Sequence, residues 1–212
     1  MTTEIMPHVC DHTFENDAIS GFKTTNSSRS TIPDVTDKVA IFMDFDNMYK
    51  GFRETVFGIR GVHIDLTEMD KLLANGRQVV VRRAYNGEVI GYNPHTVFQK
   101  AESAGYELAT EMCDGYIQKG VDVRLALEMD DCSRDSNCDT ILLISGDADF
   151  VPVVRRARKF GKKIQVASFK NCLSHSLEEA ADVIIPLDRL RMLDVDPSIL
   201  NGQTDESSEV KS

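Results

Sequence analysis

Short apolar runs rich in β-branched residues alternate with amphipathic stretches between about residues 37 and 190. Some runs are apolar at every position, as in Val39-Ala40-Ile41-Phe42-Met43, which is typical of strands covered on both faces in a parallel sheet. The expected strands are Lys38–Asp44, Gln78–Tyr85, Tyr106–Met112, Thr140–Ser145, Lys163–Ser168 and Asp182–Pro186. The expected helices are at about Asn47–Val56, Leu66–Ala74, Pro94–Ala104, Val121–Asp130, Phe150–Phe160 and Ser174–Ala181. This alternation predicts a Rossmann-like three-layer α/β sandwich with a mostly parallel central sheet.

Polar, aperiodic segments flank the patterned region. We expect a disordered N-terminal tail over 1–36, one folded domain over 37–192 and an acidic, disordered C-terminal tail over 193–212. The first thirty residues contain no apolar core of a secretory signal, and the apolar runs are too short to cross a bilayer. We therefore expect no membrane partner and a place inside the cell, in the cytoplasm, with the nucleus left open.

The net charge of −10 is concentrated outside the expected domain. Residues 1–36 carry five acidic and two basic side chains, and residues 194–212 carry five acidic and one basic. That leaves 24 acidic and 21 basic side chains in residues 37–193. The expected domain is thus close to neutral, and a basic surface for nucleic acid is compatible with the acidic chain.

Aspartates stand repeatedly where strands end. Asp44 closes the first strand, Asp147 and Asp149 follow the fourth, and Asp122 stands at the start of a helix. Each alone could cap a helix, but ligands of such sheets bind at the carboxyl ends of the strands, where these acids would gather. Gathered carboxylates raise one another's pKa unless a cation neutralises them, and oxygen-only clusters suit Mg²⁺ or Mn²⁺. A cation held there can activate water and stabilise charge on a phosphate, which favours phosphodiester hydrolysis.

Three sequence blocks occur in order along the expected domain: Ala40-Ile41-Phe42-Met43-Asp44-Phe45-Asp46-Asn47, Lys119-Gly120-Val121-Asp122-Val123 and Leu143-Ile144-Ser145-Gly146-Asp147-Ala148-Asp149-Phe150-Val151-Pro152. Together they resemble the NYN domain, the LabA-like branch of the PIN-like nuclease superfamily. The resemblance covers about residues 37–190. It implies a PIN-like fold and a metal-dependent ribonuclease, an endonuclease that uses Mg²⁺ or Mn²⁺.

The resemblance also assigns roles to single residues. Its metal-binding and catalytic acids match Asp44, Asp122, Asp147 and Asp149, and its supporting polar positions match Asn47 and Ser145. Glu128 stands where many relatives have Asp, but it is about 120° around the helix from Asp122, so we do not expect it to be a ligand.

Basic side chains near the expected site are candidates for binding RNA. These are Lys50, Arg53, Arg82, Arg83, Lys119 and Arg155. Arg155 belongs to a basic helical stripe that could either follow phosphates or face solvent, and Lys119 could bind RNA or merely balance Asp122. We expect single-stranded RNA as the partner, with the tails available to recruit proteins and homodimer formation left open.

Two other interpretations compete with the nuclease. Asp44-Phe45-Asp46-Asn47 also resembles the first motif of haloacid-dehalogenase-type phosphatases, but their late motif needs an Asp where Val151 and Pro152 stand. A catalytically silent RNA-binding or protein-assembly module with the same fold is harder to exclude, because function belongs to the site and not to the fold. Metal binding distinguishes the silent module from the enzyme.

Overall fold

The computed structural model describes residues 23–24, 36–57, 62–86, 94–109, 120–190 and 192–195. The strands are β1 (Lys23–Thr24), β2 (Lys38–Asp44), β3 (Val62–Ile64), β4 (Gln78–Tyr85), β5 (Glu107–Ala109), β6 (Thr140–Ile144), β7 (Lys163–Ser168), β8 (Val183–Pro186) and β9 (Leu193–Val195). The α-helices are α1 (Phe45–Thr55), α2 (Leu66–Ala74), α3 (Pro94–Ser103), α4 (Val121–Arg134), α5 (Val151–Lys159) and α6 (His175–Ala180). Two 3₁₀ turns, η1 (Ala148–Phe150) and η2 (Leu187–Arg189), complete the described elements.

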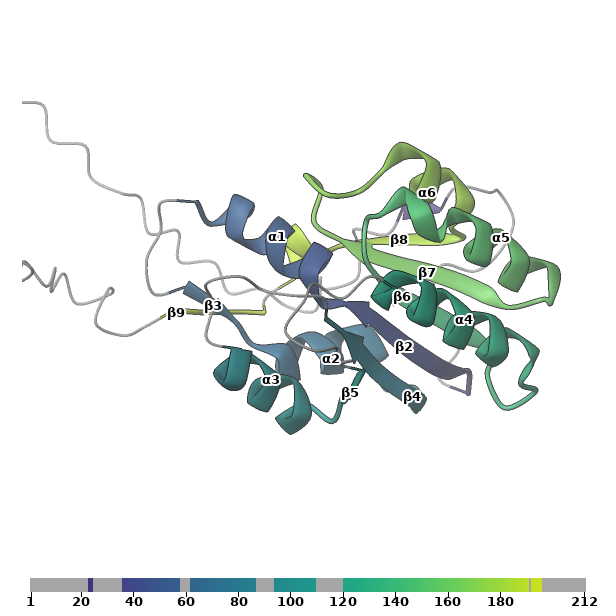
Figure 1. The fold of residues 1–212 in the computed structure, drawn as a ribbon, viewed down its shortest axis with the longest axis horizontal. Coiled ribbons are helices and arrows are strands. Elements are labelled where there is room, and N and C mark those ends of the chain that lie inside the picture. The colour runs from purple at the N-terminus through teal and green to yellow at the C-terminus, as the bar shows by residue number, and fades with distance from the viewer. Residues whose placement is uncertain are drawn as a thin grey trace, which may run out of the picture.

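Three layers make up the fold (Figure 1). The central sheet has the strand order β1-β8-β7-β6-β2-β4-β5, and all neighbouring strands in it are parallel except β1 and β8. Side chains of α1, α2 and α3 pack into one hydrophobic core on one face of the sheet, and those of α4, α5 and α6 pack into a second core on the other face. The predicted α/β sandwich with a mostly parallel sheet is confirmed.

The central strand β2 shows why its sequence is apolar throughout. Val39, Ile41 and Met43 point into the core beneath α1 and α2, while Ala40 and Phe42 point into the core beneath α4 and α5. All five side chains are buried. Burying a side chain of the size of Val, Met or Phe contributes about 1.5–3 kcal/mol, so this strand anchors both layers.

The chain reverses its direction of travel across the sheet beside β2. β4 and β5, which follow β2 in the sequence, lie on one side of β2 in the sheet, and the later strands β6, β7 and β8 lie on its other side. A doubly wound sheet opens a crevice at such a point, at the carboxyl ends of the two strands that flank it. Here those strands are β2 and β6, which end at Asp44 and Ile144.

Some short elements differ from the expectation. β3 and β9 form a separate two-stranded antiparallel sheet, and β1 pairs antiparallel with β8 at the edge of the main sheet. Lys23–Thr24 and Leu193–Val195 therefore carry structure inside segments that we expected to be disordered, because edge strands offer unpaired backbone groups. Of the expected strand Tyr106–Met112, the structure shows Glu107–Ala109, and residues 110–112 lie outside the described residues.

Candidate active site

Asp44 ends β2 and at the same time caps α1. Its carboxylate Oδ1 accepts a hydrogen bond from the backbone N–H of Asn47 at 3.1 Å, and its Oδ2 accepts one from the Ser145 hydroxyl at 2.8 Å. The side chain is buried, with the residue only 7% exposed. The capping interpretation is thus confirmed for Asp44, and the cap fixes the orientation of the carboxylate at the strand end.

The loop after β6 is tied to this carboxylate. Ser145 Oγ also accepts a hydrogen bond from the backbone N–H of Asp147 at 3.2 Å, and Asn47 Oδ1 accepts one from the N–H of Gly146 at 2.9 Å. Two side chains therefore join the end of β2 to the end of β6 across the crevice. Asn47 and Ser145, which the resemblance gave as polar positions beside the acids, thus hold the Asp147 turn against the end of β2.

Gly146 has no room for a side chain. A Cβ atom there would lie 2.2 Å from the main-chain oxygen of Cys172 and 2.7 Å from the Ser168 hydroxyl. Its own carbonyl accepts a hydrogen bond from the backbone N–H of Ser174 at 2.8 Å. Close packing against the segment after β7 thus shapes the turn that presents Asp147.

Asp147 and Asp149 occupy the turn that follows. Asp147 caps η1, and its Oδ1 accepts a hydrogen bond from the backbone N–H of Asp149 at 3.0 Å. Asp149 itself is exposed. Asp122 lies in the first turn of α4, and this helix begins directly after Gly120, whose φ of 118° favours glycine.

The negative charges of these acids act on one another. Burial raises the pKa of Asp44 to about 6, helped by the negative charges of Asp122 and Asp46 and opposed by the hydrogen bonds from Asn47 and Ser145. Burial also raises the pKa of Asp122, and the charges of Asp147 and Asp149 add to that rise. Within the described part of the chain, no Lys, Arg or His forms a salt bridge with any of the four acids.

The donor set fits a hard divalent cation. Carboxylates from β2, α4 and the β6 loop, with the Ser145 hydroxyl, supply only oxygen ligands and an uncompensated negative charge, which suits Mg²⁺ or Mn²⁺. Among the described residues, no three acidic, His or Cys side chains already converge as an ion site. Asp147 Oδ1 accepts the N–H of Asp149, and we expect this side chain to turn for its carboxylate to converge with the other acids on one ion.

The expected arginines of β4 are engaged elsewhere. Arg82 forms a salt bridge with Asp70 of α2 at 3.0 Å, and Arg83 pairs with Glu107 and with Glu128 of α4. Neighbouring residues of a strand face opposite sides of the sheet, so the guanidinium groups of Arg82 and Arg83 lie on opposite faces. Arg82 and Arg83 each neutralise a carboxylate in this arrangement, which weakens their candidacy as phosphate ligands, and RNA binding by either one stays a prediction.

Glu128 is part of a structural network and not of the acidic cluster. It accepts a hydrogen bond from the Tyr85 hydroxyl at 2.5 Å and pairs with Arg124 at 2.9 Å, in addition to Arg83. Burial raises the pKa of Glu128, but these hydrogen bonds together outweigh it and hold that pKa below its usual range. The network ties α4 to β4, and only the tertiary structure reveals it.

The other expected RNA-binding residues differ in their positions. Lys50 and Arg53 are exposed on α1, the helix that begins directly after Asp44. Arg155 is exposed on α5, the helix that follows the Asp147 turn. Lys119 lies outside the described residues.

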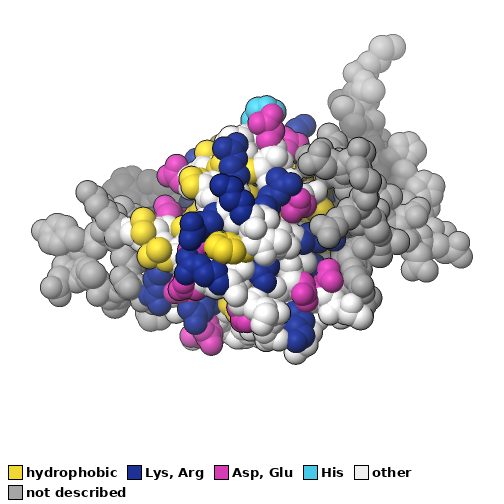
Figure 2. Space-filling model, turned by 90° about the vertical axis from the view of Figure 1, so that its right-hand side faces the viewer, with side chains coloured by type: hydrophobic (Ala, Val, Ile, Leu, Met, Phe, Trp, Pro, Cys, Tyr) yellow, Lys and Arg dark blue, Asp and Glu magenta, His cyan; other side chains and the backbone are white. Residues whose placement is uncertain are grey.

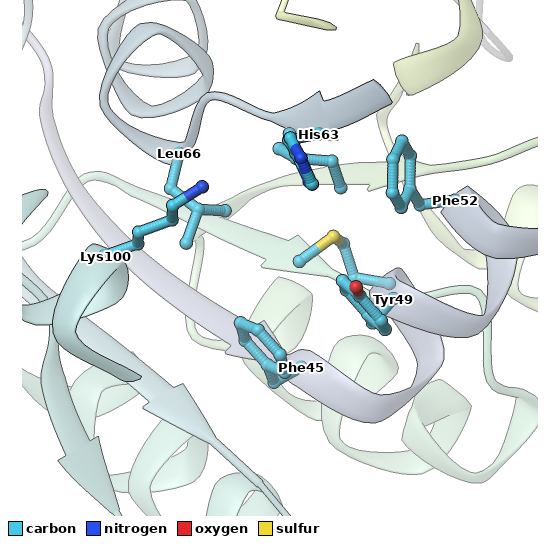
Figure 3. Close-up of a pocket in the computed structure, with 8 residues that line it drawn as sticks. Phe45, Tyr49, Phe52, His63, Leu66 and Lys100 are labelled. Atoms are coloured by element: carbon cyan, nitrogen blue, oxygen red, sulfur yellow. The ribbon is translucent and has the colours of Figure 1, made fainter. Parts of the chain in front are cut away.

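An apolar pocket of about 30 Å³ lies on the α1 side of the sheet (Figure 3). Its lining includes Phe45, Tyr49 and Phe52 of α1, facing His63, Leu66 and Lys100 from β3, α2 and α3. A volume of this size holds about one water molecule, so the pocket cannot admit a nucleotide as it stands. The acidic cluster remains the candidate site.

The fold and the acidic strand ends define a class of protein, the PIN-like α/β domains, and comparison with known proteins narrows it. The NYN domain family matches residues 38–188, so the chain belongs to this family, whose members are PIN-like nuclease superfamily proteins.

Among the helices that the structure describes, none has the length and the apolar character that a membrane span requires.

Two relatives show how far the likeness extends. The uncharacterized protein MJ0482 of Methanocaldococcus jannaschii is 26% identical over 157 residues, which are 74% of this chain and 58% of that protein. A crystal structure of a protein of unknown function, VPA0982 from Vibrio parahaemolyticus, matches with a TM-score of 0.60 and 24% identity over 74% of this chain and 96% of that one. This chain thus spans little more than half the length of the first relative, and the second supports the fold alone.

Proposed function

We propose that this protein is a metal-dependent ribonuclease that hydrolyses internal phosphodiester bonds of RNA. The observation that carries the proposal is the gathering of four coupled aspartates, none of them in a salt bridge among the described residues, at the switch point of a NYN domain. A cluster of unneutralised carboxylates is costly in a folded protein unless a cation uses it.

Asp44, Asp122, Asp147 and Asp149 would hold Mg²⁺ or Mn²⁺. When bound, the ion supplies an activated water and stabilises charge on the phosphate and on the leaving oxygen. Asp44 is the fixed member of the set, because two hydrogen bonds orient its carboxylate. Ser145 and Asn47 position the Asp147 turn against it.

Protonation of Asp44 sets a lower pH limit for this chemistry. A carboxyl group must lose its proton to hold a cation, and the pKa of Asp44 is raised to about 6 without metal. Activity is therefore expected to fall as the pH decreases through about 6, with a lower midpoint at high metal concentration because metal and proton compete.

We propose single-stranded RNA as the substrate. Lys50 and Arg53 are exposed on α1, the helix that Asp44 caps, and can contact the phosphates of a strand that extends from the crevice along this helix. Unpaired RNA can bring a phosphate into contact with a recessed carboxylate such as Asp44 more readily than a stiff duplex can. We further propose a place in the cytoplasm, where such RNA is abundant.

One observation favours a second candidate, a silent RNA-binding or assembly module. In the described part of the chain, no three potential ligands already converge, so the site as it stands is not a preformed metal centre. If the side chain of Asp147 cannot rotate away from its turn, the fold would bind RNA without cleaving it.

Cleavage of a labelled single-stranded RNA in Mn²⁺, in Mg²⁺ and in EDTA distinguishes the two candidates. Wild type is compared with Asp44→Asn and Asp147→Asn, and with Asp65→Asn as a matched control, because Asp65 is likewise a helix-capping aspartate but lies at the start of α2. We expect wild type and Asp65→Asn to cleave only with metal, and both site variants to be inactive. RNA binding without metal-dependent cleavage would support the silent module.

A further inference from the structure

A basic surface lies at the end of the molecule opposite the acidic cluster. α4 and α5 both finish there and β7 begins there, whereas the acids lie at the other ends of the strands. Figure 2 looks onto this end and shows Lys and Arg side chains gathered around a hydrophobic one. The basic end consists of Arg134, Arg156, Lys159, Lys162 and Lys163.

Phe160 lies beside two arginines of the basic end. It is 46% exposed, and the guanidinium carbons of Arg134 and Arg156 lie 5.9 Å and 5.4 Å from the centre of its ring. Asp130 forms salt bridges with both arginines, and its Oδ1 lies 2.5 Å from Arg156 Nε. The chain therefore holds an aromatic ring and two planar cations together at its surface, a geometry stabilised by cation–π attraction.

Some cations on the basic end and beside it have no salt bridge within the described residues. Arg155 and Lys159 are exposed on α5, and neither has a salt bridge within the described residues. Lys162 Nζ donates to the main-chain carbonyls of Asp135 and Cys138, which leaves its charge unneutralised. On a chain of net charge −10, such a surface is complementary to an anionic partner.

Helix α5 connects the two ends of the molecule. It begins directly after η1, which contains Asp149, and ends directly before Phe160. Its nine residues span roughly 14 Å at 1.5 Å per residue. Pro152, Arg155 and Lys159 are exposed and follow one another at helical spacing along its outer side, so a polyanion can pass from the acidic cluster to Phe160 over this helix.

We propose that Phe160 and the basic end form a second contact site for single-stranded RNA, in which a base stacks on Phe160 while phosphates contact Arg155 and Lys159. The substrate class rests on the proposed function. Stacking requires an unpaired base with a free face, which a single strand offers and a duplex or an acidic peptide does not. The site extends the binding surface beyond the scissile bond and holds the strand on the side of α5.

Binding in EDTA tests this inference without any cleavage. Fluorescence anisotropy measures the Kd of a labelled oligouridine twelve-mer for wild type, Phe160→Ala and Phe160→Trp, with Phe57→Ala as the matched control because Phe57 is 89% exposed at the end of α1. We expect Phe160→Ala to raise Kd by roughly 5- to 150-fold, the range for loss of one stacked base. Phe160→Trp and Phe57→Ala are expected to bind like wild type, and thermal melting verifies that each variant is folded.

Charge is tested by the salt dependence of the same Kd. Lys159→Ala should reduce the slope of log K against log salt by about 0.7, the value for one phosphate contact on a single strand, while exposed Lys71→Ala should leave it unchanged. A blunt RNA duplex and a polyglutamate peptide are titrated as competing classes of partner.

A Phe160→Ala variant that binds the twelve-mer within twofold of wild type overturns the inference. So does equal sensitivity of duplex or polyglutamate binding to that substitution, or a wild type that binds no RNA. The outcome is separable from that of the proposed function: Phe160-dependent binding without cleavage in Mn²⁺ removes only the nuclease, and cleavage with Phe160-independent binding removes only the second site.

Discussion

Replacing Asp44 by Asn should make the metal-free protein more stable at pH 8, although it removes a residue of the proposed site. Burial raises the pKa of Asp44 from 3.8 to about 6 in the folded chain. Below about pH 4 the carboxyl is protonated in both the folded and unfolded states, and its charge costs nothing. Between about pH 4 and pH 6 the unfolded chain releases the proton while the folded chain keeps it, so the free energy of unfolding falls as the pH rises.

The size of the effect follows from the shift of the pKa. About two pKa units correspond to about 3 kcal/mol of lost stability once the pH is well above 6. Asn has nearly the same shape and no charge, but it has one acceptor oxygen where the carboxylate has two, so one of the hydrogen bonds from Asn47 and Ser145 is lost, which costs about 1 kcal/mol. The net gain for Asp44→Asn at pH 8 is therefore about 1–2 kcal/mol.

Urea denaturation in EDTA at pH 4.5 and at pH 8 measures this difference. We expect Asp44→Asn to exceed wild type at pH 8 and to lose most or all of that advantage at pH 4.5. Asp65→Asn, which replaces the exposed capping aspartate of α2, serves as the control for loss of a capping charge. A variant that is less stable than wild type at pH 8, or whose advantage is the same at both pH values, would refute the account of a strained, charged Asp44.

Three further outcomes follow from the structure. Millimolar Mn²⁺ should raise the Tm of wild type but not of Asp44→Asn, because an ion at one hundred times its Kd stabilises the folded state by about 2.7 kcal/mol; calorimetry with and without the ion measures it. Gly146→Ala should cost about 1–3 kcal/mol in urea denaturation, since its Cβ would meet the Cys172 carbonyl at 2.2 Å, and an equally stable variant would contradict that packing. Tyr85→Phe should cost about 1–2 kcal/mol, because the half-buried Glu128 loses a hydrogen-bond donor, and the same denaturation experiment checks it.

The parts of the fold that the sequence predicted are those with long, regular patterns. β2, β4 and β7 have the bounds expected for them. For β2 the reason is plain: a strand buried on both faces needs an unbroken apolar run, and few other elements do. The acids of the site were predictable for a related reason. Each follows a strand or opens a helix, and parallel strands bring their carboxyl ends to one edge.

Other features depend on contacts that no local pattern carries. β3 and β9 are three residues each and pair across some 130 positions of the chain, so neither has a period to detect. The sequence gives Arg82 and Arg83 only as basic side chains near the expected site. The structure shows that their carboxylate partners come from α2 and α4, which no local pattern indicates. The sequence predicts only that a helix ends at Phe160, whereas the structure shows that the Phe160 ring is exposed beside two arginines.

Anomalous scattering from a manganese-soaked crystal of the wild-type protein tests directly whether the aspartates at the ends of β2 and β6 bind a metal ion. We expect an anomalous peak at the carboxyl ends of β2 and β6, about 2.0–2.3 Å from carboxylate oxygens of Asp44 and Asp147. We also expect the Asp147 side chain to be turned away from the N–H of Asp149. The same soak of Asp147→Asn crystals should show a weaker peak or none. No peak at this edge in wild type at millimolar Mn²⁺, or a peak bound only elsewhere on the chain, would contradict the claim that these aspartates form a metal-dependent catalytic centre.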